Sequence, residues 1–381
     1  MKKLSLKQRR SDILRCLRDR KKHLKNNNSS KYDDKNKSSE WKEINRWIDS
    51  LIIKKTIKIE KLKRRNFILF LPESLNFCDD YEETALYFQV IRKLGHGNKL
   101  SNKAYKLKSV NFDSLKKIST SASLVLTAEI SKWEDILNAD LVPNIENWQP
   151  EIIEQFLEVG FFDLFNNQPE LPKVSNTSDL ALVKYIKGQC GDAKKSRVLR
   201  KALQQLIGDD INKWTFLRSG LDEAITNVSH HAYPEHKYKN NAEKNWYLTG
   251  SLNKSTKELK IVFYDQGIGI PNTLKASELW EKIYKSLSFI PQAQRKLDSI
   301  LIKAAVEVER TSTGEEDRGK GLQDLLEFIK HRSDGYLSII SQRGLYKYSI
   351  INGKVKNKSE SFKAPILGTL LIWSVTLEGE I

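Results

Sequence analysis

The chain has 381 residues, of which 39% are hydrophobic and 30% are charged, and its formal net charge is +17. These values are typical of a soluble protein of two to three domains. Its apolar runs are too short to span a membrane, and its basic N-terminus lacks the apolar segment of a signal peptide, so a cytoplasmic location is expected. The cysteines Cys16, Cys78 and Cys190 lie far apart in the sequence, which argues against a disulfide framework or a zinc site.

The basic charge is concentrated in an N-terminal arm, residues 1–65. The arm holds 23 Lys and Arg against 8 Asp and Glu, a net charge of +15, so about +2 remains for residues 66–381. Such an arm could bind the phosphate backbone of nucleic acid in a salt-dependent way, without reading the bases. Alternatively, the apolar side chains of Trp41, Trp47 and Ile48 pack on the body of the protein and the lysines only solvate it.

Short elements are expected in the arm and directly after it. Helical spacing predicts a basic helix over residues 4–24 and a second helix over residues 41–51, with a polar low-complexity piece at residues 26–39 between them. Residues 67–71 and 105–112 read as strands because they are apolar or alternate between apolar and polar.

A hydroxyl-rich turn at Ser119, Thr120 and Ser121 leads into the next predicted helix. The order of strand, serine-bearing loop and helix within residues 66–165 resembles the anti-sigma-antagonist (STAS) fold, in which a loop serine is the phosphoacceptor for a partner kinase. The resemblance implies that one of these hydroxyls accepts phosphate; the alternative is a helix cap, a role that Ser and Thr favour. Residues 166–184, rich in Asn, Pro and Ser, are expected to be a linker.

The helix predicted over residues 214–231 carries Glu223 and Asn227 four positions apart, on one face. A carboxylate can take a proton from water or a hydroxyl group, and an amide oxygen one turn later can ligate Mg²⁺. The pair is therefore a candidate for a catalytic base and a metal ligand. The alternative is an ordinary solvated helix face.

Two further strands, residues 246–252 and 258–264, are predicted to lead to Asp265. A buried carboxylate there can accept a hydrogen bond from an exocyclic amine such as that of adenine, and Gly267 and Gly269 leave room for a base to approach. Because Asp-x-Gly is also common in tight turns, a simple turn is the alternative.

The motif Arg318-Gly319-Lys320-Gly321 comes last. It is not a P-loop, because the position after the lysine holds glycine rather than the Ser or Thr that would bind Mg²⁺. We expect a polar lid over residues 311–318 that leads into a helix over residues 323–331, whose free N–H groups can face phosphate oxygens. The arginine and the lysine would add positive charge at this point.

In this order the three motifs resemble the ATP-binding fold shared by gyrase, the ninety-kilodalton heat-shock chaperone, histidine kinases and MutL (GHKL), over residues 185–378. The resemblance implies that Glu223 is the base, that Asn227 binds Mg²⁺ and that Asp265 binds adenine. It also implies that Thr369, expected at the start of a late strand, helps to hold the adenine-site carboxylate. The glycines that would form the two glycine boxes are Gly267, Gly269, Gly319 and Gly321.

Within this group, the sequence around Glu223 is most similar to the anti-sigma-factor serine kinases. A sensor histidine kinase is not expected, because the upstream histidines, His23 and His96, do not lie on a phosphoacceptor helix. A gyrase or MutL subunit would need a transducer domain after the module, which is not expected here. His230 and His231 are expected to support the helix end rather than to bind a metal.

The expected fold is therefore α/β (α+β): a Bergerat-type sandwich of helices on a mixed sheet at residues 185–381, a small STAS-like domain at residues 66–165, the linker at residues 166–184 and the basic helical arm at residues 1–65. The expected function is an Mg²⁺-dependent, slowly hydrolysing ATP switch. The alternatives are a protein serine/threonine kinase and a nucleic-acid-binding effector with an ATP-sensing module. The expected partners are ATP and a protein but no membrane; nucleic acid on the arm and a homodimer stay open.

Overall fold

The computed structural model describes residues 29–137, 144–166, 168–171, 179–190, 192, 195–207, 215–238, 240, 243–274, 280–291, 294–295, 297–312, 321–331 and 334–377. Helices and strands are mixed along the chain, so the α/β class is confirmed at this coarse level. The chain divides into two compact units, one of residues 1–68 and 93–108 and the other of residues 69–92 and 109–381.

The first unit contains α2 (Ser29–Ile53), β1 (Lys58–Lys61), a 3₁₀ turn (Lys63–Arg65) and parts of β2 (Asn66–Phe70), α3 (Tyr81–Leu100) and β4 (Lys106–Asn111). Its three-stranded sheet has the order β1-β2-β4. The strands predicted at residues 67–71 and 105–112 are thus confirmed. Helix α2 begins at Ser29, inside the polar low-complexity piece at residues 26–39, so part of that piece is helical.

The apolar side chains of α2 pack inside this unit. Ile48 is fully buried, and Ile44 and Leu51 are buried beside it at helical spacing. The Asn45 side chain accepts a hydrogen bond from the backbone N–H of Tyr105 at 2.8 Å. Of the three residues that the packed alternative names, Ile48 is buried and Trp41 and Trp47 are half-buried, whereas residues 1–28 lie outside the described residues.

The second unit is built on a sheet of six described strands in the order β10-β11-β9-β8-β6, with β7 also paired to β8. A mixed sheet is expected from the sequence, but each of these pairs is antiparallel, because hairpins join β8 to β9 and β10 to β11. The strand bounds are β6 Leu180–Leu182, β7 Ile186–Gln189, β8 Asn245–Asn253, β9 Glu258–Asp265, β10 Gly335–Ile351 and β11 Lys354–Thr376.

The edge strand β6 corrects the predicted linker. It lies within residues 166–184, and its Ala181 is paired with Leu252 of β8. The end of that segment is therefore part of the sheet. The sequence does not predict this strand, because three residues are too few to show an alternating pattern of apolar and polar side chains.

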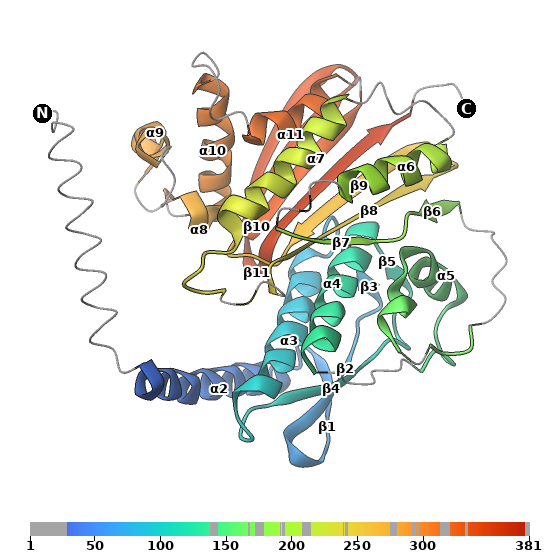
Figure 1. Cartoon of the computed structure of the whole chain (residues 1–381), viewed down its shortest axis with the longest axis vertical. Helices are drawn as coiled ribbons and strands as arrows, with labels where there is room; N and C mark the ends of the chain where they lie inside the picture. The colour runs from blue at the N-terminus through green and yellow to red at the C-terminus, as the bar shows by residue number, and fades with distance from the viewer. Residues whose placement is uncertain are drawn as a thin grey trace, which may run out of the picture. The chain divides into compact units, whose positions relative to one another are not determined.

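Helices cover one face of the sheet, as Figure 1 shows for α6, α7 and α11. Their apolar side chains meet those of Trp246, Phe263 and Trp373 from the sheet in one core. The helices predicted at residues 214–231 and 323–331 are confirmed as α7 and α11. The elements that surround this core are α6 Ser196–Ile207, α7 Thr215–Asn227, a π-helical turn Val228–Ala232, α8 Ile270–Leu274, α9 Trp280–Ser286, a 3₁₀ turn Leu287–Phe289, α10 Asp298–Ser312 and α11 Gly321–Lys330.

Helix α4 (Thr120–Leu137) packs on the opposite face of the same sheet. The Ser131 hydroxyl lies 2.8 Å from the Tyr247 hydroxyl of β8, and Thr120 Oγ1 lies 2.9 Å from Ser251 Oγ. Both contacts are buried. They use Tyr247 and Ser251, which alternate along β8 with Trp246 and Leu248 of the first core.

The rest of the middle region also belongs to this unit: β3 Ser74–Leu75, β5 Lys117–Ile118, α5 Pro150–Val159 and a 3₁₀ turn Phe161–Leu164. β3 and β5 pair in parallel. Residues 69–92 and 109–165 therefore lie in one compact unit with the C-terminal half. From the sequence, residues 66–165 are expected to form a separate STAS-like domain. That division stays a prediction.

Candidate functional site

A pocket opens between the helices and the sheet of the second unit. It encloses about 880 Å³ of empty space, part of it open to solvent, and it is lined by α7, the π-helical turn, β9, β11 and the short helices α8 and α9. Four residues predicted as site residues from the sequence line it together: Asn227, Asp265, Gly269 and Thr369. They come from three separate motifs, and the fold brings them to one place.

Asp265 is the last residue of β9 and is almost fully buried, with 3% of its surface exposed. Its Oδ1 accepts a hydrogen bond from the Gly267 N–H at 2.8 Å. Burial raises the pKa of this carboxyl group to about 6, although hydrogen bonds from Gly267 and Thr369 oppose the shift. Asp265 lines the pocket, so its carboxylate can accept a hydrogen bond from a ligand that donates one.

Thr369 lies directly opposite Asp265 in the register of β11 and β9. The sequence places Thr369 at the start of a strand, which is wrong: β11 begins at Lys354, and Thr369 lies well inside it. The feature read as a strand start is a local irregularity at Gly368, whose φ is +107°. A Cβ at Gly368 would lie 1.9 Å from the Asp265 carbonyl oxygen, so only glycine lets the two strands approach here.

Gly269 also requires the absence of a side chain. Its φ is +80°, and a Cβ would lie 2.7 Å from the hydroxyl oxygen of Ser341. That hydroxyl accepts a hydrogen bond from the Ile270 N–H at 2.9 Å and lies 3.2 Å from Thr369 Oγ1. Ser341 therefore joins the loop after β9 to β11, a role that the sequence did not indicate.

The pocket walls are largely apolar, which suits a flat aromatic ring. The sequence did not predict most of these residues, because they are ordinary core side chains in their own elements. The apolar lining residues are Ala224, Val228, Ala232, Phe263, Ile270, Leu274, Ile283, Leu325 and Leu371. Ile283 belongs to α9, so part of the segment between the two glycine boxes forms a wall of the pocket.

His231 lines the pocket from the π-helical turn that follows α7. Partial burial and the neighbouring His230 lower the pKa of its imidazole. The sequence assigns both histidines a supporting role at the helix end. Single-turn π-helices are frequent at functional sites, and this turn aims His231 at the cavity.

Glu223 lies on α7 one turn before Asn227, is half-buried and is not among the lining residues. Gly267 is buried behind the pocket and acts through its N–H bond to Asp265. Gly321 is the first residue of α11, and Leu325, one turn later, lines the pocket. Arg318, Gly319 and Lys320 lie outside the described residues, as does most of the predicted lid.

A magnesium ion bound to phosphate oxygens needs few protein ligands, and Asn227 presents an amide group in the pocket. Among the described residues, no group of three or more His, Cys, Asp or Glu side chains could hold a metal ion by itself. A metal site at Asn227 would therefore need oxygen ligands from a bound molecule.

The predicted phosphoacceptor turn lies at the N-terminus of α4. Ser119 Oγ accepts a hydrogen bond from the Ala122 N–H at 3.2 Å, as a helix cap does. Thr120 and Ser121 are buried, each with 4% of its surface exposed, whereas Ser119 is half-buried. If one of the three accepts phosphate, Ser119 is the one that a partner can reach most readily.

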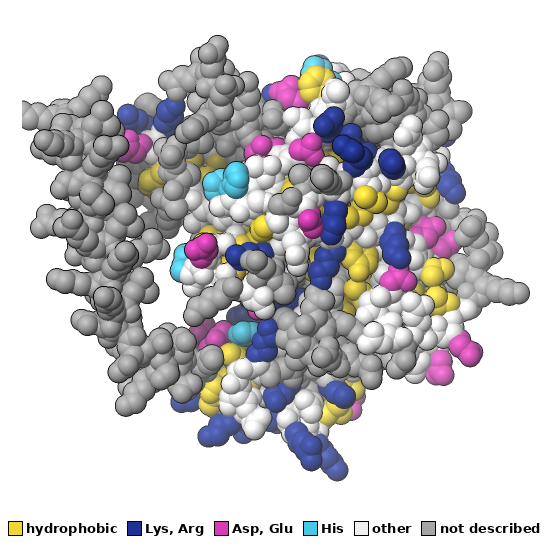
Figure 2. All heavy atoms as spheres, in the orientation of Figure 1, with side chains coloured by type: hydrophobic (Ala, Val, Ile, Leu, Met, Phe, Trp, Pro, Cys, Tyr) yellow, Lys and Arg dark blue, Asp and Glu magenta, His cyan; other side chains and the backbone are white. Residues whose placement is uncertain are grey.

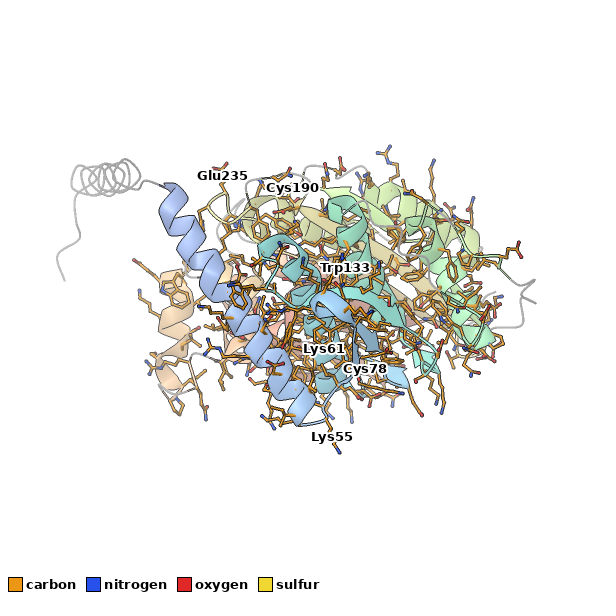
Figure 3. The ribbon with its side chains drawn as sticks, turned by 90° about the horizontal axis from the view of Figure 1, so that it is seen from below. Lys55, Lys61, Cys78, Trp133, Cys190 and Glu235 are labelled. Carbon is orange, nitrogen blue, oxygen red and sulfur yellow. The ribbon has the colours of Figure 1, made fainter. Side chains whose placement is uncertain are left out.

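Two surface features bear on the remaining predictions. Cys78 and Cys190 are free thiols, and Figure 3 labels them well apart. On the face drawn in Figure 2, the described Lys and Arg side chains are interspersed with Asp and Glu. Nucleic-acid binding by the arm stays a prediction.

No protein-family model and no curated protein matches this sequence. Among the described residues, no helix combines the length and the apolar character that a membrane span requires. The function must therefore be argued from the pocket itself.

Proposed function

We propose that the second unit binds ATP in the pocket between α7 and the sheet, as a GHKL-type module, and that it hydrolyses ATP slowly as a regulatory switch. The observation that carries the proposal is the pairing of the buried Asp265 carboxylate with apolar walls and with Asn227 in one cavity. This combination suits a ligand with a flat ring, an exocyclic amine and a charged tail. Adenine nucleotides have all three.

Each residue has a defined task in this proposal. Asp265 accepts a hydrogen bond from the adenine amine, and Thr369 lies opposite to orient the carboxylate. Asn227 contributes an oxygen ligand to Mg²⁺ on the phosphates. Glu223, one helical turn away, takes the proton of a water molecule that attacks the γ-phosphorus, so that the bond to the leaving phosphate oxygen breaks and ADP departs.

A protein serine/threonine kinase differs from this switch only in the acceptor, since a hydroxyl group would replace water. The half-buried Ser119, at the start of α4, keeps this alternative open. The kinase alternative also includes a STAS-like fold for residues 66–165. That fold is supported only by the sequence resemblance.

The test uses purified full-length protein with γ-labelled ATP and Mg²⁺, and separates free phosphate from label retained on the chain. We expect free phosphate from the wild type and none above background from Glu223→Ala. Asp222→Asn, on the same helix and bonded to Ser196, is the matched control and should keep wild-type turnover. Label on Ser119 instead of free phosphate would establish the kinase; equal turnover by wild type and Glu223→Ala would remove the assignment of Glu223.

A further inference from the structure

A buried ion pair lies behind the candidate adenine site, on the opposite face of the sheet. Arg92 of α3 and Glu129 of α4 form it, with Arg92 Nε 2.9 Å from Glu129 Oε2 and a second, shorter bond beside it. The Glu129 side chain is 1% exposed and that of Arg92 is 17% exposed. Although burial alone would raise it, the Arg92 charge holds the pKa of Glu129 below its usual value.

Both charged side chains form hydrogen bonds with Tyr264 of β9. The Tyr264 hydroxyl accepts a hydrogen bond from Arg92 at 2.8 Å and lies 3.0 Å from Glu129 Oε1. It also lies 2.8 Å from the Leu367 carbonyl oxygen, just before Gly368. The ion pair therefore bonds to β9 at Tyr264, and the Tyr264 hydroxyl connects it to β11.

Gln266 makes the second connection. Its Nε2 donates to Glu129 Oε1 at 3.1 Å and to the Ala128 carbonyl oxygen at 3.2 Å. Its buried Oε1 has no hydrogen-bond partner among the described residues. Leaving this oxygen unpaired costs free energy. The two hydrogen bonds of Nε2 offset that cost and fix the orientation of the Gln266 side chain.

Tyr264 and Gln266 are the neighbours of Asp265 on either side. Side chains alternate along a strand, so these two point to the α4 face while Asp265 and Phe263 point into the pocket. Arg92 and Glu129 bond to Tyr264, and Glu129 also bonds to Gln266. A displacement of the ion pair would therefore change the orientation of the Asp265 carboxylate between them.

We propose that Arg92 and Glu129 are positioning residues that hold the Asp265-Gln266-Gly267 turn from the reverse face of the sheet, so that α3 and α4 set how well the pocket binds and selects adenine. The consequence for binding rests on the proposed ATP function. The positioning of the turn itself does not.

The test compares full-length wild type with the double variant Arg92→Met, Glu129→Leu. Replacing both charges avoids an unpaired buried ion, and Tyr264 and Gln266 keep their carbonyl partners. Ser131→Ala is the matched control, since it removes a buried bond between α4 and β8 that does not involve the neighbours of Asp265. Glu129→Gln, which keeps the side-chain shape, is measured in parallel in case the double variant does not fold.

Hydrogen exchange is measured first, at the Gln266 and Gly267 amides, which are bonded to Tyr233 Oη and Asp265 Oδ1. We expect exchange at least tenfold faster at these two amides in the double variant, a change in the same direction in Glu129→Gln, and less than a twofold change in Ser131→Ala. Wild-type exchange at both amides in the double variant or, if it does not fold, in Glu129→Gln would overturn the proposal.

The ratio of ATP to GTP dissociation constants is measured next, because a loss of overall stability would not change that ratio. We expect the preference for ATP to fall at least fivefold in the double variant and to stay within twofold in Ser131→Ala. An unchanged preference would overturn the link to the pocket. If the wild type binds neither nucleotide while the two amides respond as expected, the ATP function fails and the positioning role stands.

Discussion

At the scale of single residues, Asp265 combines the features most unusual for a structural side chain. A carboxylate that is 3% exposed gains little from water, and the fold gives it hydrogen bonds from the Gly267 N–H and the Thr369 side chain. Its pKa of about 6 lies above the ordinary value of 3.8, so the folded state holds its proton more tightly than the unfolded state. Such a residue costs stability near neutral pH, which is typical of functional sites.

The sign of this cost can be tested with Asp265→Asn. Well below pH 3.8 the carboxyl is protonated in both states and the penalty is absent. Between pH 3.8 and about 6 the unfolded state ionises before the folded state, so above pH 6 the penalty reaches on the order of 3 kcal/mol. We therefore expect the melting temperature of Asp265→Asn to exceed that of the wild type at pH 8, with the gap closing toward pH 4. Thermal melts across this range would contradict the account if the variant were less stable at pH 8.

The sequence predicted Asn227, Asp265 and Gly269 from motifs with a chemical reason for their residue types, and Thr369 from the family resemblance; the fold brings all four together. The sequence did not predict His231, Ser341 or Ile283. Those residues look ordinary in their own segments, and only the packing of three separate elements turns them toward the cavity. Glu223 was predicted with them, but it does not line the pocket, although its neighbour Ala224 does.

At the scale of elements, the close approach of β9 to β11 depends on Gly368. The backbone conformation at this position is unfavourable for any residue with a side chain. Gly368 has a φ of +107°, and its missing Cβ leaves room for the Asp265 carbonyl. The pairing itself involves continuous apolar runs, Ile261–Tyr264 in β9 and Leu370–Trp373 in β11, which are typical of strands buried on both faces. The true length of β11 was not predictable, because its exposed first half carries polar residues that read as a loop.

Gly368→Ala should therefore destabilise the protein by about 2–4 kcal/mol, because it adds both a clash and an unfavourable φ. Gly353→Ala is the matched control: φ there is +71°, but nothing lies within 4 Å of the added Cβ, so a loss of only about 1 kcal/mol is expected. Urea denaturation measures both. Equal losses would show that the close approach at Asp265 contributes nothing.

At the scale of the whole molecule, one sheet carries two cores. Phe263 belongs to the core under α7, whereas Val262 and Tyr264, its neighbours in β9, are buried away from that core. The polar contacts that join α4 to this second face link residues more than a hundred positions apart, such as Ser131 and Tyr247. No local pattern reveals such pairs, so these contacts could not be predicted from the sequence.

A fragment of residues 179–381 tests this arrangement. It retains every described strand of the large sheet but lacks α3 and α4, so Tyr247 and Tyr264 would face water. We expect the fragment to aggregate or to lose cooperative unfolding, while the full chain unfolds in a cooperative transition. A monomeric fragment that melts within a few degrees of the full chain would mean that the covered face is not needed for folding.

The central claim is that Asp265 recognises adenine in this pocket. Titration calorimetry of Mg²⁺-ATP at pH 8, where the carboxyl is ionised, tests it most directly with wild type, Asp265→Asn and Glu258→Gln, a matched change at the other end of β9. We predict that Asp265→Asn weakens ATP binding at least about tenfold, since a hydrogen bond to a charged group contributes roughly 1.5–3 kcal/mol, and that Glu258→Gln binds like the wild type. A wild type that binds no ATP, or three proteins that bind it equally, would contradict the account.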